Sequence, residues 1–240
     1  MNKPTILSAL LSATLLSSTS QAAFHFMQIE EVIGGINGNN TAQAIQLRTR
    51  LGNQNVLAGT RLLAWDANGA NPILLFDFTS TYAPAADPGD SILLVTPAFN
   101  LGMLTTTPAF APDFTLTNPI PASYLSGGKV TFGADNQTTF YWSFAFGSYL
   151  GTNTGTTDND ANGLFGAPFA SALPIGSLQG VRFTGAASAL STTNVADYAL
   201  TANPATVKNA SGVSYAVVPE PASAALVGLG VLFLARRRRA

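Results

Sequence analysis

The sequence predicts an all-β protein, and three observations support that prediction. The chain holds 22 Gly and 14 Pro in 240 residues, which leaves little room for long helices. Through its middle, apolar residues alternate with polar ones, as in strands that place one face on a core. Turn motifs such as Asn37-Gly38 and Asn162-Gly163 separate these segments. Many short strands divided in this way are typical of a β-sandwich or β-barrel.

The expected strands lie between residues 23 and 202. The clearest alternation puts Ile45, Leu47 and Thr49 on one face of a strand and Gln46 and Arg48 on the other. The same reasoning predicts strands at 24–33, 61–65, 73–79, 91–96, 129–132, 138–146 and 180–184. About 180 residues bury an adequate core without disulfides, and the chain has no Cys. A single domain over 23–202 is therefore expected.

The first 22 residues have the three-part layout of a secretory signal peptide. Lys3 precedes an apolar stretch at 6–16, and Ser20-Gln21-Ala22 places small residues before a cleavage point. The apolar stretch is shorter than the ~20 residues that a membrane-spanning helix needs. We therefore expect passage through the secretion translocon and cleavage between Ala22 and Ala23.

The C-terminal 23 residues form a second targeting segment, after the signal peptide. An apolar or small stretch occupies 222–235, and the motif before it is Val218, Pro219, Glu220 and Pro221. The basic cluster after it is Arg236, Arg237, Arg238 and Arg239. The two prolines favour an extended chain, the form in which a protease binds its substrate.

The apolar stretch 222–235 predicts a short transmembrane helix, because Ala and Leu are strong helix formers. As a helix it measures about 21 Å, against the ~30 Å of a bilayer's hydrocarbon core. Arginine side chains extend to the interface and stay on the cytoplasmic side. The sequence therefore predicts a weak tether in the inner membrane, with the preceding domain outside.

Residues 218–240 closely resemble the PEP-CTERM sorting signal, in which a Pro-Glu-Pro motif, a short membrane helix and a basic cluster end the chain. The resemblance implies recognition by an exosortase, a membrane-embedded cysteine protease or transpeptidase. It also implies delivery to the cell surface or extracellular matrix of a Gram-negative bacterium that makes exopolysaccharide. An ordinary single-pass anchor is the alternative interpretation.

The first half of the domain resembles the lamin-tail type of immunoglobulin-like β-sandwich. The segments that carry this resemblance are 29–32, 43–47, 56–62 and 92–94, with the turn 88–90 before the last of them. Thr60 stands where that family usually has Trp, and Gln46 where Glu is common. The resemblance favours a sandwich over a barrel and implies binding or scaffolding rather than catalysis.

Residues 203–217 are expected to form a linker, with a last strand at 213–217 as the one ordered part. Asn203-Pro204 and the segment 209–212 are rich in loop-forming residues. A linker here gives a sorting enzyme room to reach Pro219. Between residues 23 and 219 acidic residues outnumber basic ones, so the chain lacks the basic surface of a nucleic-acid-binding protein.

The chain offers few groups for catalysis, and we expect a non-enzymatic protein. The chain has no Cys, and its single His is His25. Neither a cysteine nucleophile nor the usual zinc site can therefore be built. Glu30 and Glu31 are adjacent, which on a regular strand places them on opposite faces. A secreted hydrolase carrying the same tail is the alternative function.

One segment is a candidate calcium site. Asp158, Asp160 and Asn162 stand at positions 1, 3 and 5 of an EF-hand-like loop, followed by Gly163. Phe169 occupies position 12, where such a loop needs Glu, and a polar turn explains the same residues. A calcium-dependent adhesin is thus a third possible function, and no other cofactor is expected.

Aromatic residues gather at 140–146. On a regular strand Phe140, Trp142, Phe144 and Phe146 share one face, which we assign to the core. A carbohydrate-binding platform would need exposed rings, and the candidates are Tyr82, Tyr141 and Tyr149.

Overall fold

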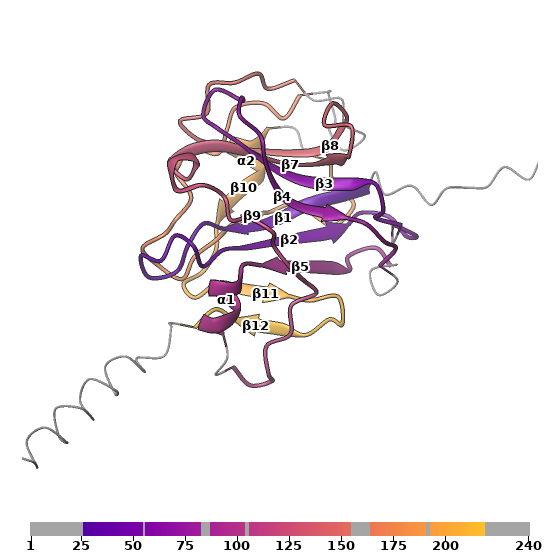
Figure 1. Cartoon of the computed structure of the whole chain (residues 1–240), viewed down its shortest axis with the longest axis vertical. Helices are drawn as coiled ribbons and strands as arrows, with labels where there is room; N and C mark the ends of the chain where they lie inside the picture. The colour runs from indigo at the N-terminus through magenta and orange to yellow at the C-terminus, as the bar shows by residue number, and fades with distance from the viewer. Residues whose placement is uncertain are drawn as a thin grey trace, which may run out of the picture.

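The computed structural model describes residues 26–54, 56–82, 87–103, 106–154, 164–190 and 193–218. Most of its elements are strands, in two sheets and a separate hairpin (Figure 1). The six-stranded sheet runs in the order β10 (Tyr198–Leu200), β9 (Val181–Phe183), β1 (Met27–Ile33), β2 (Ala44–Thr49), β5 (Ser91–Val95) and β6 (Phe114–Thr115). The four-stranded sheet runs β4 (Ile73–Phe78), β3 (Thr60–Trp65), β7 (Gly127–Ala134) and β8 (Phe140–Gly147). The hairpin joins β11 (Thr206–Lys208) to β12 (Ser214–Ala216).

The all-β prediction is confirmed, and each expected strand has a counterpart in the structure. The helices of the described residues are short: α1 (Pro97–Gly102), α2 (Asn194–Asp197) and a 3₁₀ turn at Ala122–Tyr124. The alternation in the sequence identified the strands because each strand of the two sheets sends every second side chain to a common core.

The main core lies between the two sheets. Ile29 and Ile45 reach it from the six-stranded sheet, and Leu62 and Phe132 reach it from the four-stranded sheet. Figure 1 shows β3, β7 and β8 as one layer over β1 and β2. Trp142 is the largest fully buried side chain, and its indole nitrogen donates to the hydroxyl of Tyr198 at 2.6 Å. Strands distant in the sequence are therefore joined through this core.

The six-stranded sheet is covered on its other face as well. Leu93 and Val95 of β5 pack there with Phe99 of α1 and with Val207 and Tyr215 of the hairpin. All five residues of β5 are buried, which explains its nearly unbroken apolar sequence. We call this second side of the sheet, away from the main core, its outer face.

The linker expected at 203–217 is not what the structure shows. Ala205, Val207, Tyr215 and Val217 are buried in the cluster on the outer face, and β11 pairs with β12. The apolar residues alternate through both short strands, but loop-forming residues at 203–204 and 209–212 conceal that pattern in the sequence. The folded domain therefore continues to the start of the C-terminal tail.

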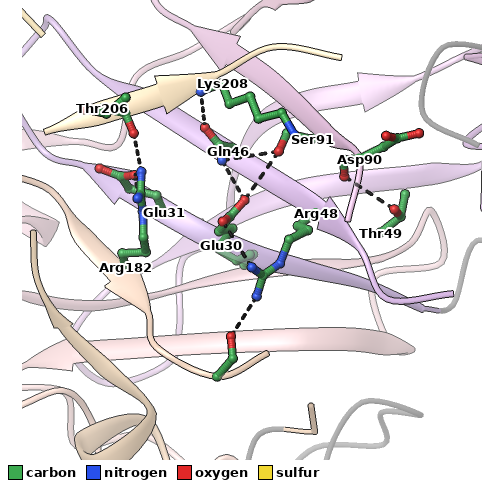
Figure 2. A network of polar contacts seen from close by, with 12 residues as sticks. Glu30, Glu31, Gln46, Arg48, Thr49, Asp90, Ser91, Arg182, Thr206 and Lys208 are labelled. Carbon is green, nitrogen blue, oxygen red and sulfur yellow. Dashed lines mark hydrogen bonds and ion pairs between the residues drawn. The ribbon is translucent and has the colours of Figure 1, made fainter. Parts of the chain in front are cut away.

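A β-bulge corrects the expectation for the two adjacent glutamates. The pairing of β1 with β2 shifts between Ile29 and Glu31. Ile29 and Val32 both face the main core, so Glu30 and Glu31 between them share the outer face (Figure 2). The expectation of opposite faces is wrong because the extra residue interrupts the two-residue period of the strand.

A similar shift occurs in β8, whose pairing with β7 slips at Phe132 and Gly133. Trp142, Phe144 and Phe146 lie in the main core as expected. Phe140 instead makes an edge-to-face contact with Trp65 on the far side of the four-stranded sheet, at 5.6 Å between ring centroids. The assignment of Phe140 to the core is therefore wrong.

Candidate functional site

A network of polar side chains lies on the outer face of the six-stranded sheet, beneath the hairpin (Figure 2). At its centre Glu30 Oε2 accepts a hydrogen bond from Gln46 Nε2 at 2.5 Å, and Ser91 Oγ lies 3.5 Å away. Glu30 Oε1 pairs with Arg48 Nη1 at 3.3 Å. We call these residues, with Glu31 and Arg182, the outer-face network.

Glu31 is the most deeply buried charge of the network, with 1% of its side chain exposed. Arg182 Nε donates to Glu31 Oε2 at 2.7 Å, and Arg182 Nη2 donates to the same oxygen and to the carbonyl of Thr206. Burial raises the pKa of Glu31 to about 7, although Arg182 opposes this rise. Nearby Glu30 adds to the rise. Glu31 Oε1 has no hydrogen-bond partner among the described residues.

The outer-face network connects the sheet to the hairpin. Gln46 Oε1 accepts from the backbone nitrogen of Lys208 at 2.6 Å, while the same side chain donates to Glu30. From β9, Arg182 donates to the carbonyl of Thr206. Both attachments use side chains of the sheet and backbone atoms of β11 (Figure 2). The hairpin thus covers one side of the outer-face network.

Beside the outer-face network is an open hollow of about 460 Å³. Glu30, Arg48 and Arg182 line it, together with residues 183–185 and 199–202. Arg48 also donates to the carbonyl of Gly185 at 3.1 Å. Each glutamate of the network is paired with an arginine, which is the arrangement of a buried ion-pair network and not of a free acid–base pair.

A second polar feature lies on the far side of the four-stranded sheet, where four aromatic rings surround Lys129. Its Nζ lies 5.0–5.6 Å from the ring centroids of Trp65, Phe140, Tyr149 and Phe165. Lys129 is 7% exposed, and among the described residues no carboxylate pairs with it. Burial lowers the pKa of its ammonium to about 8. The faces of the rings attract the charged form and oppose this decrease.

Neither feature was anticipated from the sequence. The bulges that bring Glu31 beside Glu30 and Phe140 beside Lys129 depend on how strands pair. The available signal was a pair of acids inside a largely apolar strand, 27–33, which indicates buried charges in need of partners. Arg182, the partner of Glu31, is 151 residues away in the sequence.

Most residues singled out from the sequence lie outside the described part of the chain. They are Ala22 and Ala23 at the cleavage point, His25, the calcium candidates Asp158, Asp160 and Asn162, the motif residues Pro219, Glu220 and Pro221, and Arg236, Arg237, Arg238 and Arg239. Val218 is described, and it packs against the apolar cluster of the outer face. The tail's apolar stretch 222–235 also falls outside.

Within the described ranges, no group of three or more potential metal-ligating side chains occurs. In that same part of the chain, no helix combines the length and the hydropathy needed to cross a membrane. Tyr141 and Tyr149 are each 5% exposed, and Tyr82 is partly buried with its hydroxyl donating to Asp113. The three tyrosines are therefore not the exposed rings that a carbohydrate platform requires.

Comparison with known proteins identifies the C-terminal region alone. No curated protein matches the chain. Residues 217–239 match the family model described as the PEP-CTERM protein-sorting motif. That match covers the Pro-Glu-Pro motif, the apolar stretch and the arginine cluster in the order that the sequence predicted. The chain therefore carries a PEP-CTERM sorting signal, which implies export, a transient membrane anchor and processing by an exosortase.

Proposed function

We propose that this protein is a non-enzymatic surface or extracellular-matrix protein, with a β-sandwich domain that is released from the inner membrane by an exosortase. The observation that carries the proposal is the sorting motif at 217–239. The predicted signal peptide at 1–22 supplies the export that the motif requires. Exopolysaccharide outside the cell is the proposed surrounding of the released domain.

The chemistry of the tail supports its role as a removable handle. Pro219 and Pro221 favour an extended chain around Glu220, which suits binding in a protease-like groove. The stretch 222–235 is about 9 Å shorter as a helix than the hydrocarbon core is thick. A tether of this kind holds the domain at the membrane but is less firmly inserted than a full-length helix.

The strand order supports an immunoglobulin-like sandwich of the lamin-tail type. An immunoglobulin domain places strands A, B and E in one sheet and C, F and G in the other, with C′ beside C in variable-type domains. Here β1, β2 and β5 are neighbours in one sheet, while β4, β3, β7 and β8 form the other. With β1 as A and β8 as G, this order matches that pattern, and β9 and β10 extend the edge beside β1.

A binding or structural role accords with the described polar groups. The glutamates of the outer-face network are held by Arg48 and Arg182, and Lys129 is enclosed by aromatic rings. These groups are engaged with partners inside the fold, which leaves the surface of the domain for contact with matrix components. We infer that the domain acts by presenting this surface and not by turning over a substrate.

The experiment follows the protein in a host with and without the exosortase. With the enzyme, the mature protein is expected to begin at Ala23, to lack Arg236–Arg239 and to leave the inner-membrane fraction. A Glu220→Ala variant tests the motif, and Asp135→Ala, at an exposed turn of the folded domain, is the matched control. Intact-mass spectrometry of each fraction measures the outcome. Retention of the arginines in the mature protein of the enzyme-bearing host would contradict the proposal.

A further inference from the structure

The folded domain ends directly at the sorting motif. Val217 is 1% exposed, and its backbone nitrogen donates to the carbonyl of Ala205 at 2.9 Å. Val218 packs against the same apolar cluster, and Pro219 is the next residue. The chain thus has no spacer between the packed hairpin and the residues that the sorting enzyme must recognise.

This junction is too short for a membrane enzyme to reach past the domain. Only Pro219, Glu220 and Pro221 separate Val218 from the apolar stretch that begins at Ala222. Fully extended, three residues span about 11 Å. A domain of this size has a radius of gyration of about 16 Å. With the hairpin packed, the domain would occupy the space in which the enzyme grips the motif.

The hairpin is built as a separable unit. β11 and β12 pair with each other and form a two-stranded sheet apart from the other strands (Figure 1). Side chains of the six-stranded sheet supply two of its polar attachments: Gln46 to Lys208 and Arg182 to Thr206. Three further hydrogen bonds tie the segment to neighbouring loops, from Ala205 N to the carbonyl of Leu178, from Ala210 N to Asp113 Oδ2 and from Asn209 Nδ2 to the carbonyl of Ala111. Its departure leaves the strand ladders of both sheets hydrogen-bonded.

Departure of the hairpin would also expose the buried charges to water. Glu30 and Glu31 are 8% and 1% exposed beneath it, and Glu31 Oε1 lacks a hydrogen-bond partner among the described residues. Hydration of these carboxylates offsets part of the loss when Val207 and Tyr215 leave the apolar cluster. The free energy of opening this interface is therefore smaller than its apolar contacts alone would give.

We propose that the hairpin β11–β12 detaches from the outer face and its two strands separate when the tail is processed, so that residues 203–218 become the spacer that delivers the motif to the exosortase. The inference rests on the proposed function. In the released state the 16 residues from 203 to 218 span up to about 55 Å. The packed hairpin then limits processing to the fraction of molecules in which it is open.

The test compares the rate of processing of five full-length proteins in the exosortase-bearing host by pulse-chase labelling. One carries ten Gly and Ser residues between Val218 and Pro219, which supply a spacer without opening the hairpin. Tyr215→Ala weakens the hairpin's packing, and Leu75→Ala weakens the main core as a control for general destabilisation. The fourth variant combines the insertion with Tyr215→Ala, and the unaltered chain is the reference.

The insertion is expected to raise the rate about tenfold, as when a minor open state limits the reaction. Tyr215→Ala is expected to raise it in the unaltered tail and to have no further effect in the chain with the insertion. An unchanged rate with the insertion, or an equal acceleration by Leu75→Ala, overturns the inference and leaves the proposed function standing. Absence of exosortase-dependent processing in all five proteins overturns both.

Hydrogen exchange gives a readout that does not depend on the enzyme. In the purified full-length chain in detergent, the amides of Val207 and Tyr215 are expected to exchange through a smaller opening than those of Ile45 and Leu47 in β2. Exchange of the two groups at the same free energy would mean that the hairpin opens only when the whole domain unfolds, and the inference would fail.

Discussion

At the scale of single residues, the molecule is distinguished by charges held inside it. Glu31 and Lys129 lie in different parts of the fold and are almost fully buried. Glu31 keeps one arginine partner, whereas Lys129 has aromatic rings in place of a carboxylate. Burial shifts both pKa values toward neutrality, to about 7 for Glu31 and about 8 for Lys129. Each shift makes the stability of the fold depend on pH.

The first prediction concerns Glu31. Its pKa rises from 4.5 in the unfolded chain to about 7 in the folded one, so between these values the folded state holds more protons. The contribution to stability is therefore complete below pH 4.5 and is lost as the pH rises through 7. A shift of this size corresponds to about 3 kcal/mol over the window. Glu31→Gln is expected to remove this loss.

Urea unfolding of the domain at pH values from 4.5 to 8 measures the effect of Glu31→Gln. Asp135→Asn, at an exposed turn, is the control and should keep the slope of the unaltered protein. If the glutamine variant loses stability with rising pH as steeply as the unaltered protein does, another group is responsible.

At the scale of elements, the ring of aromatics around Lys129 joins strands to a loop. Trp65 belongs to β3, Lys129 to β7 and Phe140 to β8. Tyr149 and Phe165 come from the segment that follows β8. The ammonium of Lys129 therefore lies among rings from two neighbouring strands and from the segment that follows β8. We expect it to hold that segment against the sheet.

The second prediction follows from the pKa of Lys129, which falls from 10.5 to about 8 on folding. Between these values the unfolded chain holds more protons, so stability rises with pH across the window and is lower below pH 8. The rise amounts to about 3 kcal/mol. Lys129→Met keeps a long, flexible side chain among the rings, and it is expected to abolish the rise because it carries no proton.

Differential scanning calorimetry from pH 7.5 to 10 compares Lys129→Met with Lys208→Met, which alters a half-buried lysine of the hairpin. The hairpin variant should keep the increase in stability above pH 8. An increase of the same size in Lys129→Met would show that the enclosed ammonium is not its source.

At the scale of the whole molecule, linear order and spatial pairing differ in how far the sequence predicts them. The sorting motif was predicted from residue order alone, because Pro219, Glu220 and Pro221 act in a tail and need no partner from the fold. Eight of the ten strands in the two sheets were predicted because period-two alternation reports one buried face, and the two that were not predicted, β6 and β10, have only two and three residues.

The remainder depends on which strands meet. The bulge at Glu30 is set by the pairing of β1 with β2, so the outer-face network cannot be read from β1 alone. The second strand of the hairpin, β12, lies within the last strand expected at 213–217, but β11 was missed because Val207 sits in a strand of three residues, too short for a period to stand out. Both missed features belong to the same face of the sheet, where segments distant in the sequence come together.

The last prediction concerns the precursor as a whole. The strength of its anchoring in the membrane is set by the length of its C-terminal apolar stretch. The residues 222–235 fall short of the hydrocarbon core by about 9 Å as a helix. Inserting six Leu after Gly228 brings the stretch to about 20 residues, enough for a full crossing. In a host without the exosortase, the lengthened precursor is expected to resist alkaline extraction from membranes, while the unaltered precursor is partly released. Insertion of six Ser at the same place is the control and should increase release, because Ser adds length without apolar surface. Equal retention of the unaltered and Leu-lengthened proteins would show that the short tether already anchors the domain fully.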